Sequence, residues 1–328
     1  MALRFSTAYF VSLLVAFLPI VAALAAGGNR DLTELSLEEL TRIEVTSVSR
    51  KEEPLADAAA AVAVITNEAI RRYGARTIPE ALRLVPGLHV AQVTSSAWGV
   101  SARGFSSVNS AKLLVLSDSR SIYTPLFSGV FWYVQDLLLE DIDRVEVIRG
   151  PGASLWGANA VNGVINITSK SARDTQGAYF EGGSGTTERG FGAVRYGGDL
   201  APGLWFRVFA QGFDRAGEFG PPDPAGDDWK LGHFGFRADW EPDAKNTLTV
   251  QGDAYAGDIG EVRPAIIVGG RPGPTGKLVL GVAGGNLLAR WTHKPASDSE
   301  IQVRAYYDAT HHDDPAFLDN LDTFDFEF

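Results

Sequence analysis

Residues 148 to 167 read IRGPGASLWGANAVNGVINI, and this stretch decides the fold. It places four glycines, three asparagines, a proline and a tryptophan between two runs of β-branched residues. Glycine permits backbone conformations with positive φ and the close approach of another segment, and asparagine side chains can satisfy the polar groups of a turn. The stretch therefore predicts a rigid, closely packed turn region between two extended runs.

The composition excludes several classes of protein. The chain has 328 residues, 45% of them hydrophobic, with a net charge of -11 and no cysteine. These values fit neither a disordered polymer nor a helical membrane bundle. The lack of cysteine excludes disulfides, cysteine-ligated zinc and a lipoprotein anchor. The acidic balance argues against nucleic acid as a partner, because nucleic-acid-binding domains carry clustered basic surfaces.

The N-terminus predicts a secretory signal peptide over residues 1–25. A basic residue, Arg4, precedes an apolar run from about Phe10, and Ala23-Leu24-Ala25 fits a cleavage site for signal peptidase. A retained membrane anchor is the alternative, although Pro19 and the Ala-Gly exit weigh against it. No later run is long enough for a spanning helix, so any membrane crossing beyond it requires a β-barrel.

Three zones follow the signal. Residues 26–55 form a polar lead with a short helix candidate, LTELSLEEL. Residues 56–175 have the mixed pattern of an α+β domain, in which Thr77, Pro79 and Glu80 resemble a capping box that begins a helix. Residues 176–328 alternate apolar and polar residues with period two, as β-strands do.

We expect about eight strands in the third zone, with short and long connections in alternation. Three tryptophans near strand ends (Trp205, Trp240, Trp291) suit an aromatic girdle, and the loop asymmetry is typical of outer-membrane barrels. A soluble β-sandwich would also alternate, and the sequence does not show which face is outward. The expected strands lie near 178–186, 190–197, 203–213, 231–241, 246–256, 283–293, 300–309 and 321–328, and the longer loops over 214–230, 257–282 and 310–320.

Several motifs in the second zone resemble the plug domain of TonB-dependent outer-membrane receptors. They are IPEALRLVPGLHV, SARGF, KLLVLSDSRSIYTPLFSGVFW and LLLEDIDRVEVIRGPGASLWGANAVNGVINITSKSA, in that order. The resemblance implies an α+β plug domain followed by antiparallel transmembrane β-barrel strands, as part of a 22-stranded barrel. It places the protein in the outer membrane of a Gram-negative bacterium, in contact with lipid. One departure is Ser117-Asp118-Ser119-Arg120, where the family commonly has Ile-Asp-Gly-Arg, and the local turn is therefore in doubt.

The resemblance also implies roles for particular residues. A set around the opening stretch would lock the plug inside the barrel, with Arg149 pairing to carboxylates of the barrel and the glycines turning tightly against the wall. A contact with the substrate is the alternative role for this set. The set comprises Arg103, Arg149, Gly150, Gly152, Gly157, Asn162 and Gly163.

The segment IEVTSVS is similar to a TonB box. An unpaired β-branched strand can add to a sheet edge of TonB through main-chain hydrogen bonds. A leading strand packed into the plug is the alternative. The residues concerned are Ile43, Glu44, Val45, Thr46, Ser47, Val48 and Ser49.

The resemblance implies that plug apices and long outer loops meet the ligand. Two plug segments fit, Val93 to Trp98 and Tyr123 to Tyr133, and their aromatic residues could contact the apolar surface of a large ligand. Packing against barrel side chains is the alternative. The candidates are Trp98, Tyr123, Thr124, Phe127, Phe131, Trp132 and Tyr133.

The length predicts a C-terminally truncated receptor. An eight-stranded barrel is filled by its own side chains and cannot enclose a plug of this size. A small complete barrel is the alternative, and the aromatic Phe328 would suit its last strand.

We expect no enzymatic chemistry and no cofactor. HHDDP, from His311 to Pro315, is a poor metal site because adjacent side chains diverge, and no phosphate-binding loop is present. The resemblance implies uptake of an iron-siderophore complex or cobalamin, energised through TonB and its inner-membrane complex. A binding module without active transport and an outer-membrane hydrolase are the alternatives.

Overall fold

The computed structural model describes residues 44–45, 53–54, 60–104, 107–109, 112–150, 156–217, 226–263, 267–268, 271–272, 276–296, 299–315 and 317–328. The chain divides into residues 1–40 and a larger unit, Thr41–Phe328, and the description concerns the larger unit. The predicted signal peptide and the helix candidate LTELSLEEL lie outside the described residues. No helix in the described ranges is long and apolar enough to cross a membrane.

The first part of the larger unit is built on a mixed five-stranded sheet. Its strand order is β3-β8-β9-β6-β7, and β6 and β9 run parallel while the other neighbours run antiparallel. A two-stranded ladder, β4-β5, accompanies it. The strands are β3 (Val62–Thr66), β4 (Leu88–Gln92), β5 (Trp98–Ala102), β6 (Leu113–Ser117), β7 (Arg120–Ser121), β8 (Ile142–Arg149) and β9 (Gly163–Ser169).

Two short helices of this domain begin at threonine caps. The Thr66 hydroxyl accepts a hydrogen bond from the amide of Ala69 at the start of α3 (Asn67–Tyr73), and α3 ends at Gly74 in the left-handed conformation. The Thr77 hydroxyl accepts from the Glu80 amide at the start of α4 (Ile78–Leu82), which confirms the predicted start. Three 3-10 helices, η4 (Trp132–Val134), η5 (Leu139–Asp141) and η6 (Arg173–Thr175), complete the domain.

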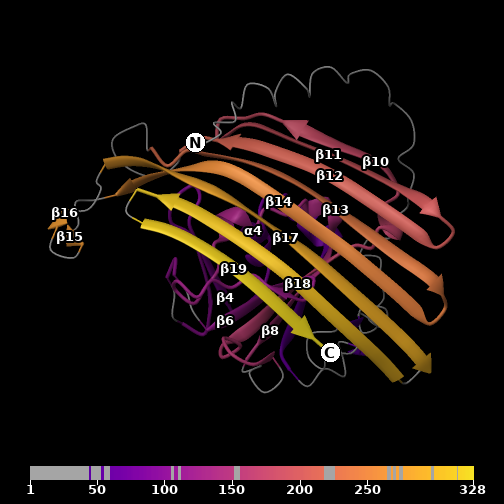
Figure 1. The fold of residues 1–328 in the computed structure, drawn as a ribbon. Helices are drawn as coiled ribbons and strands as arrows, with labels where there is room; N and C mark the ends of the chain where they lie inside the picture. The colour runs from indigo at the N-terminus through magenta and orange to yellow at the C-terminus, as the bar shows by residue number, and fades with distance from the viewer. Residues whose placement is uncertain are drawn as a thin grey trace, which may run out of the picture. The chain divides into compact units, whose positions relative to one another are not determined.

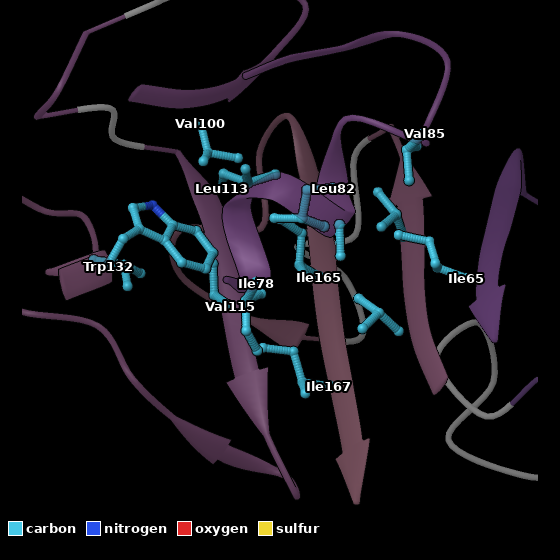
Figure 2. Packing of buried hydrophobic residues seen from close by; sticks show 14 of the residues in the cluster. Ile65, Ile78, Leu82, Val85, Val100, Leu113, Val115, Trp132, Ile165 and Ile167 are labelled. Carbon is cyan, nitrogen blue, oxygen red and sulfur yellow. The ribbon is translucent and has the colours of Figure 1, made fainter. Parts of the chain in front are cut away.

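The helices cover one face of the sheet and close a hydrophobic core (Figure 2). Ile78 and Leu82 of α4 meet Val115, Ile165 and neighbouring strand residues, and all of them are almost fully buried. Each such side chain contributes about 1.5–3 kcal/mol by leaving water. This core gives the domain an interior of its own.

The third zone forms one antiparallel sheet of eight strands, in sequence order apart from the short β15-β16 hairpin (Figure 1). All eight expected strands are confirmed, and most are longer than expected. They are β10 (Gly177–Gly183), β11 (Glu188–Ala201), β12 (Leu204–Arg215), β13 (Trp229–Asp243), β14 (Asn246–Arg263), β17 (Gly276–Ala296), β18 (Ser299–Asp314) and β19 (Phe317–Glu327), with β15 (Ile267–Val268) and β16 (Arg271–Pro272) between β14 and β17.

The apolar face of this sheet is the exposed one. Along β13, Phe234 and Phe236 are exposed whereas His233, Arg237 and Asp239 are buried against the first domain. Other strands repeat the pattern, with exposed large side chains at Phe180, Tyr196, Val208, Leu287, Tyr307, Phe324 and Phe326. A soluble sandwich would bury its apolar face. Because the apolar face of this sheet points outward, the sheet has the character of a wall that meets an apolar solvent.

The exposed face changes in character along the strands, from a charged row near one end to tryptophans near the other. Asp214, Lys230 and Asp258 lie opposite one another across three strands, and Lys230 and Asp258 form an ion pair of 3.1 Å. Trp240 and Trp291, both partly exposed, flank Leu248 near the other end of the strands. From Lys230 to Trp240 the chain is as long as the roughly 9–11 residues that a tilted strand needs to cross a bilayer.

Two expectations about this sheet are wrong. Residues 310–320 do not form a long loop, because β18 runs to Asp314 and β19 starts at Phe317. Trp205 does not point outward with Trp240 and Trp291, because it lies opposite the inward Asp239 and the guanidinium of Arg173 stacks over its ring at 5.1 Å. The girdle therefore comprises two of the three tryptophans.

A charged residue on the exposed face should test its solvent. We expect Phe236→Arg, midway between Lys230 and Trp240, to destabilise the protein folded in a bilayer by about 2–4 kcal/mol, because the guanidinium enters hydrocarbon. Urea unfolding in phospholipid vesicles measures the change, with Phe236→Leu as the apolar control. Equal stability of the two variants would contradict a lipid-facing surface.

Candidate functional site: the plug and wall interface

The exit of the first domain, residues 169–175, is bonded to the polar face of the wall. The Ala172 amide donates to Asp239 Oδ2 at 2.6 Å, and Arg237 Nη1 donates to Ser169 Oγ at 2.9 Å. Arg237 Nε also donates to Asp239 at 2.8 Å, and the Thr249 hydroxyl donates a hydrogen bond to the other oxygen of this carboxylate. One buried ion pair on β13 therefore fixes where the chain enters the wall.

A second set of contacts lies beside the exit. Asp141 is buried, and its carboxylate accepts from Arg195 Nη1 at 2.5 Å and lies 3.4 Å from Arg207 Nε. Arg207 Nη1 also donates to the carbonyl of Lys170 at 2.5 Å. Two arginines of neighbouring strands thus converge on one carboxylate of the first domain.

The hairpin between β6 and β7 supplies a third contact. Asp118 and Ser119 both have positive φ, 49° and 71°, which is the type I′ geometry of a two-residue hairpin. The tight turn therefore forms even though this sequence lacks the glycine that the family commonly has here. Asp118 accepts from the amide and hydroxyl of Ser169 at 2.8 and 2.7 Å and from Gln251 Nε2 of the wall at 2.8 Å.

The environment of Asp118 favours its charged form. Burial acts to raise the pKa of this carboxyl, but the Arg237 charge and the hydrogen bonds from Ser169 and Gln251 outweigh burial and hold the pKa below its ordinary value. Beside it, Arg120 pairs with Asp308 of β18, and Arg304 Nη1 donates to the Ser119 carbonyl at 2.6 Å. The hairpin is therefore attached to β14 and β18 together.

These contacts are charge-assisted hydrogen bonds across an interface rather than an apolar core. Such bonds have strict geometry, yet water can replace them once it reaches the groups. The first domain is therefore held in one position by these bonds, and at the other end of the interface Val134, Phe131 and Tyr133 pack in an apolar cluster with wall residues that include Trp229, Leu231 and Tyr255.

The opposite end of the interface is aromatic. We call it the long-loop end, after the connections 216–228 and 264–275. Ser95 donates its amide to Asp227 at 2.8 Å there, and the ring of Phe131 lies 4.3 Å from that of His312 and 5.3 Å from that of Tyr133. Both predicted plug segments therefore reach the wall at this end.

The predicted ligand contacts fall into two groups. Trp98 and Trp132 are buried in the core of the first domain and Thr124 is also buried, which favours the packing alternative for these three. Figure 2 shows Trp132 among the core residues. The partly exposed group forms one aromatic set at the long-loop end, and its ligand role stays a prediction. It consists of Tyr123, Phe127, Phe131 and Tyr133.

The predicted locking residues contact one another inside the first domain. Arg149 Nη1 donates to the Pro86 carbonyl at 2.8 Å, and Arg103 Nη2 donates to the Arg149 carbonyl at 3.3 Å. A Cβ at Gly163 would collide with the Ile148 carbonyl of the next strand, so this glycine permits close strand pairing.

The remaining members of this set lie near the same edge. Asn162 donates its amide to the Lys112 carbonyl at 2.9 Å, Gly150 and Gly157 have positive φ, and Gly152 lies outside the described residues. A carboxylate partner for Arg149 on a barrel stays a prediction.

The TonB-box candidate is described only at Glu44 and Val45. These residues form β1 (Glu44–Val45), which pairs with β2 (Glu53–Pro54). The described backbone is therefore paired within the chain rather than free, and TonB binding stays a prediction. Ile43, Thr46, Ser47, Val48 and Ser49 lie outside the described residues.

Sequence reasoning missed the residues that attach the first domain to the wall. Arg207, Arg237 and Asp239 alternate with the aromatic residues of their strands, so the polar row of each amphipathic strand was the available signal. No group of three or more His, Asp or Glu side chains in the described ranges could hold a metal ion.

Comparison with known proteins identifies the first domain. The family described as TonB-dependent Receptor Plug Domain matches residues 54–164. The chain is 33% identical over 144 residues to the vitamin B12 transporter BtuB of Vibrio vulnificus, covering 43% of this chain and 23% of that protein. It is 30% identical over 178 residues to the catecholate siderophore receptor Fiu of Escherichia coli, covering 52% and 22%.

Solved structures share the fold over most of the chain. The alcaligin outer-membrane receptor FauA of Bordetella pertussis matches with a TM-score of 0.64 and 15% identity, over 86% of this chain and 45% of that one. The siderophore receptor PiuA of Acinetobacter baumannii matches with a TM-score of 0.63 and 21% identity, over 84% and 40%. The chain thus spans less than half the length of these proteins.

The fold and the interface define a plug domain attached to the polar side of an open wall of eight antiparallel strands. Residues 54–164 match the plug domain of TonB-dependent receptors, and the proteins that the chain resembles over a longer range are outer-membrane receptors and transporters of this kind. The related proteins are transporters and receptors rather than enzymes, in agreement with the expectation from sequence.

Asp118 offers a test of the attachment. We expect Asp118→Asn to destabilise the plug by about 1–3 kcal/mol at neutral pH, because an amide cannot replace a carboxylate that accepts three hydrogen bonds beside Arg237. Since the folded pKa lies below the unfolded one, the carboxylate stabilises the fold fully above about pH 4 and loses this effect as the pH falls through the folded pKa. Thermal unfolding followed by circular dichroism measures both.

The control for this prediction is Asp143→Asn. Asp143 is a half-exposed plug carboxylate that pairs with Arg144 at 2.6 Å, and such pairs contribute about 0–1 kcal/mol. If the gap in stability between wild type and Asp118→Asn stays constant down to pH 3, Asp118 does not act through its charge.

Proposed function

We propose that the protein to which this chain belongs takes up a metal chelate across the outer membrane, with energy supplied through TonB. The observation that carries the proposal is the two-sided interface: the plug is fixed to the wall by charged contacts at Asp118, Asp141 and the exit, while its aromatic segments reach the long-loop end. The names of related proteins, a vitamin B12 transporter and a catecholate siderophore receptor, support the choice of a chelate.

Opening would begin where water can enter the charged interface. The wall has no need to deform, because the plug contacts it through side chains of separate strands rather than through a shared sheet. The exposed apolar face would stay in contact with lipid while the plug moves. Transport in this scheme involves no covalent step.

TonB would bind the segment from Ile43 to Ser49. Among the described residues, the pairing of Glu44 and Val45 with Glu53 and Pro54 involves two residues on each strand, so the segment would exchange this partner for a sheet edge of TonB at low cost. Main-chain hydrogen bonds would then transmit the pull to the plug.

A proline in this segment tests the proposal. We expect Val45→Pro to reduce uptake of the cognate chelate at least tenfold and leave its binding unchanged, because proline removes an amide donor from the added strand. Uptake of radiolabelled chelate by cells that produce the full-length protein is measured with and without an uncoupler.

The matched control is Val45→Ile, which keeps both the amide and the β-branch. Normal uptake by the proline variant would exclude strand addition at this segment. Uptake by the wild type that resists the uncoupler would instead support a binding module without active transport.

A further inference from the structure

We infer that the chelate crosses between the plug and the first three strands of the wall, through a cavity that a cluster of charged residues closes at each end. This inference rests on the proposed function and deepens it by naming the route of the cargo and the contacts that must open. Strands β10, β11 and β12 form this edge of the wall (Figure 1).

The cavity lies between the plug and the inner side of these three strands. It has a volume of about 370 Å³. On the plug side it is lined by the turn after α3 and by residues of the segment from Asp136 to Glu140, and on the wall side by residues of all three strands. Its lining includes the polar side chains of Tyr179, Glu181 and Gln211. Such groups can bind water, so the cavity is suited to a hydrated solute.

Glu188, at the start of β11, closes the cavity toward the long-loop end. Its carboxylate accepts a hydrogen bond from Arg215 Nε at 2.8 Å and pairs with Arg76 of the plug. Each arginine also lies over a phenylalanine ring, Arg76 over Phe191 at 4.2 Å and Arg215 over Phe213 at 3.9 Å. The two rings belong to residues that are opposite each other in the ladder. We call Arg76, Glu188 and Arg215 the upper gate.

A second cavity shows that the upper gate separates two spaces. This cavity has a volume of about 70 Å³ and shares all three residues of the upper gate with the larger cavity. It extends to Ser95, which donates its amide to Asp227 at the long-loop end. A solute that enters beside Ser95 would therefore reach the larger cavity once the upper gate opens.

The buried cluster around Asp141 closes the other end of the cavity. Arg195 lies two residues beyond Ala193, which lines the cavity, and therefore on the same inward row of β11. Arg195 and Arg207 both pair with Asp141, and Arg207 also donates to the Lys170 carbonyl at the plug exit. We call Asp141, Arg195 and Arg207 the lower gate. Each gate is thus one carboxylate between two arginines.

The two gates differ in how firmly they join the plug to the wall. At the upper gate the plug contributes Arg76, whose side chain is 43% exposed, and Glu188 and Arg215 both belong to the wall. At the lower gate two wall arginines pair with the plug carboxylate of Asp141, and no side chain of the three is more than 10% exposed. Water and salt weaken exposed ion pairs more than buried ones. We therefore expect the upper gate to open first.

The charges left behind support the same order of opening. When Arg76 leaves the upper gate, Glu188 keeps Arg215 as its partner, so no buried carboxylate is left unpaired. Withdrawal of Asp141 from the lower gate would instead separate two buried arginines from their carboxylate, which is costly. The lower gate would therefore stay closed until the plug is pulled, and the passage would be closed at one end while the cargo enters at the other.

Thiol labelling of the cavity in intact cells tests the route and needs no ligand. The chain has no cysteine, and Ala193→Cys places a thiol in the cavity lining at a side chain that is only 4% exposed. We expect Glu188→Gln to speed labelling of this thiol by a membrane-impermeant maleimide at least about tenfold, because Arg76 and Arg215 then repel each other with no carboxylate between them. The rates are measured on a full-length protein that carries no other cysteine.

Two controls are matched to these changes. Asp214→Asn removes a carboxylate from the outward row of β12 and should leave the labelling rate unchanged. Thr310→Cys places a thiol on the inward row of β18, between Asp308 and His312, which both contact the plug. Equal rates in the Glu188→Gln and Asp214→Asn backgrounds would overturn the upper gate. An equal increase at Thr310→Cys would show a general loosening of the plug and overturn a route along β10, β11 and β12.

Blocking the cavity separates the route from the proposed function. In the Glu188→Gln background we expect a bulky maleimide adduct at Ala193→Cys to reduce uptake at least about tenfold, because the adduct fills the space that the cargo needs. The probes are radiolabelled cyanocobalamin and ferric enterobactin, and a methylthio adduct at the same thiol is the control of small volume. Normal uptake with the bulky adduct would overturn the route alone, whereas uptake of neither probe by the unlabelled protein would overturn the proposed chelate uptake as well.

Discussion

The ion pair between Arg237 and Asp239 is the contact on which the arrangement of plug and wall depends. It lies on the inward row of β13, where Asp239 accepts a hydrogen bond from the Ala172 amide and Arg237 donates one to the Ser169 hydroxyl. Burying two charges costs several kcal/mol, and their attraction roughly offsets that cost, so the pair adds little net stability. Its effect is positional, because only one placement of the plug exit satisfies every donor and acceptor.

The position of this pair follows from the inverted amphipathicity of the wall. Because Phe234 and Phe236 lie on the exposed face, the polar residues of β13 point to the inner side of the wall, where their hydrogen-bond partners come from the plug or from water. The same alternation that makes one face compatible with lipid thus supplies the donors and acceptors that hold the plug. Lipid contact and plug attachment are two consequences of one period-two pattern.

Much of this fold was predictable from sequence because its signals are local. The eight strands followed from alternation, and the helix start at Thr77 followed from its cap. The attachment residues were not predictable, since Asp118 and Gln251 are far apart in the chain and meet only through the tertiary fold. The predicted strand ends were also wrong at residues 310–320. His311 and His312 were assigned to a loop, but they pair with Asn320 and Asp319 of the neighbouring strand. Polar composition there does not indicate the absence of a ladder, and His312 and Asp314 are even buried within it.

The separation of charged and neutral surfaces on one plug has a mechanical reason. Residues that hold the plug must bond strongly to the wall and exchange those bonds for water, which charged groups such as Asp118 and Asp141 can do. A ligand surface built from the same groups would compete with the attachment for every counter-charge. The aromatic set at the long-loop end, Tyr123, Phe127, Phe131 and Tyr133, carries neither a carboxylate nor a cation and avoids this competition. Attachment through charged groups and contact through aromatic rings can therefore vary independently on one plug.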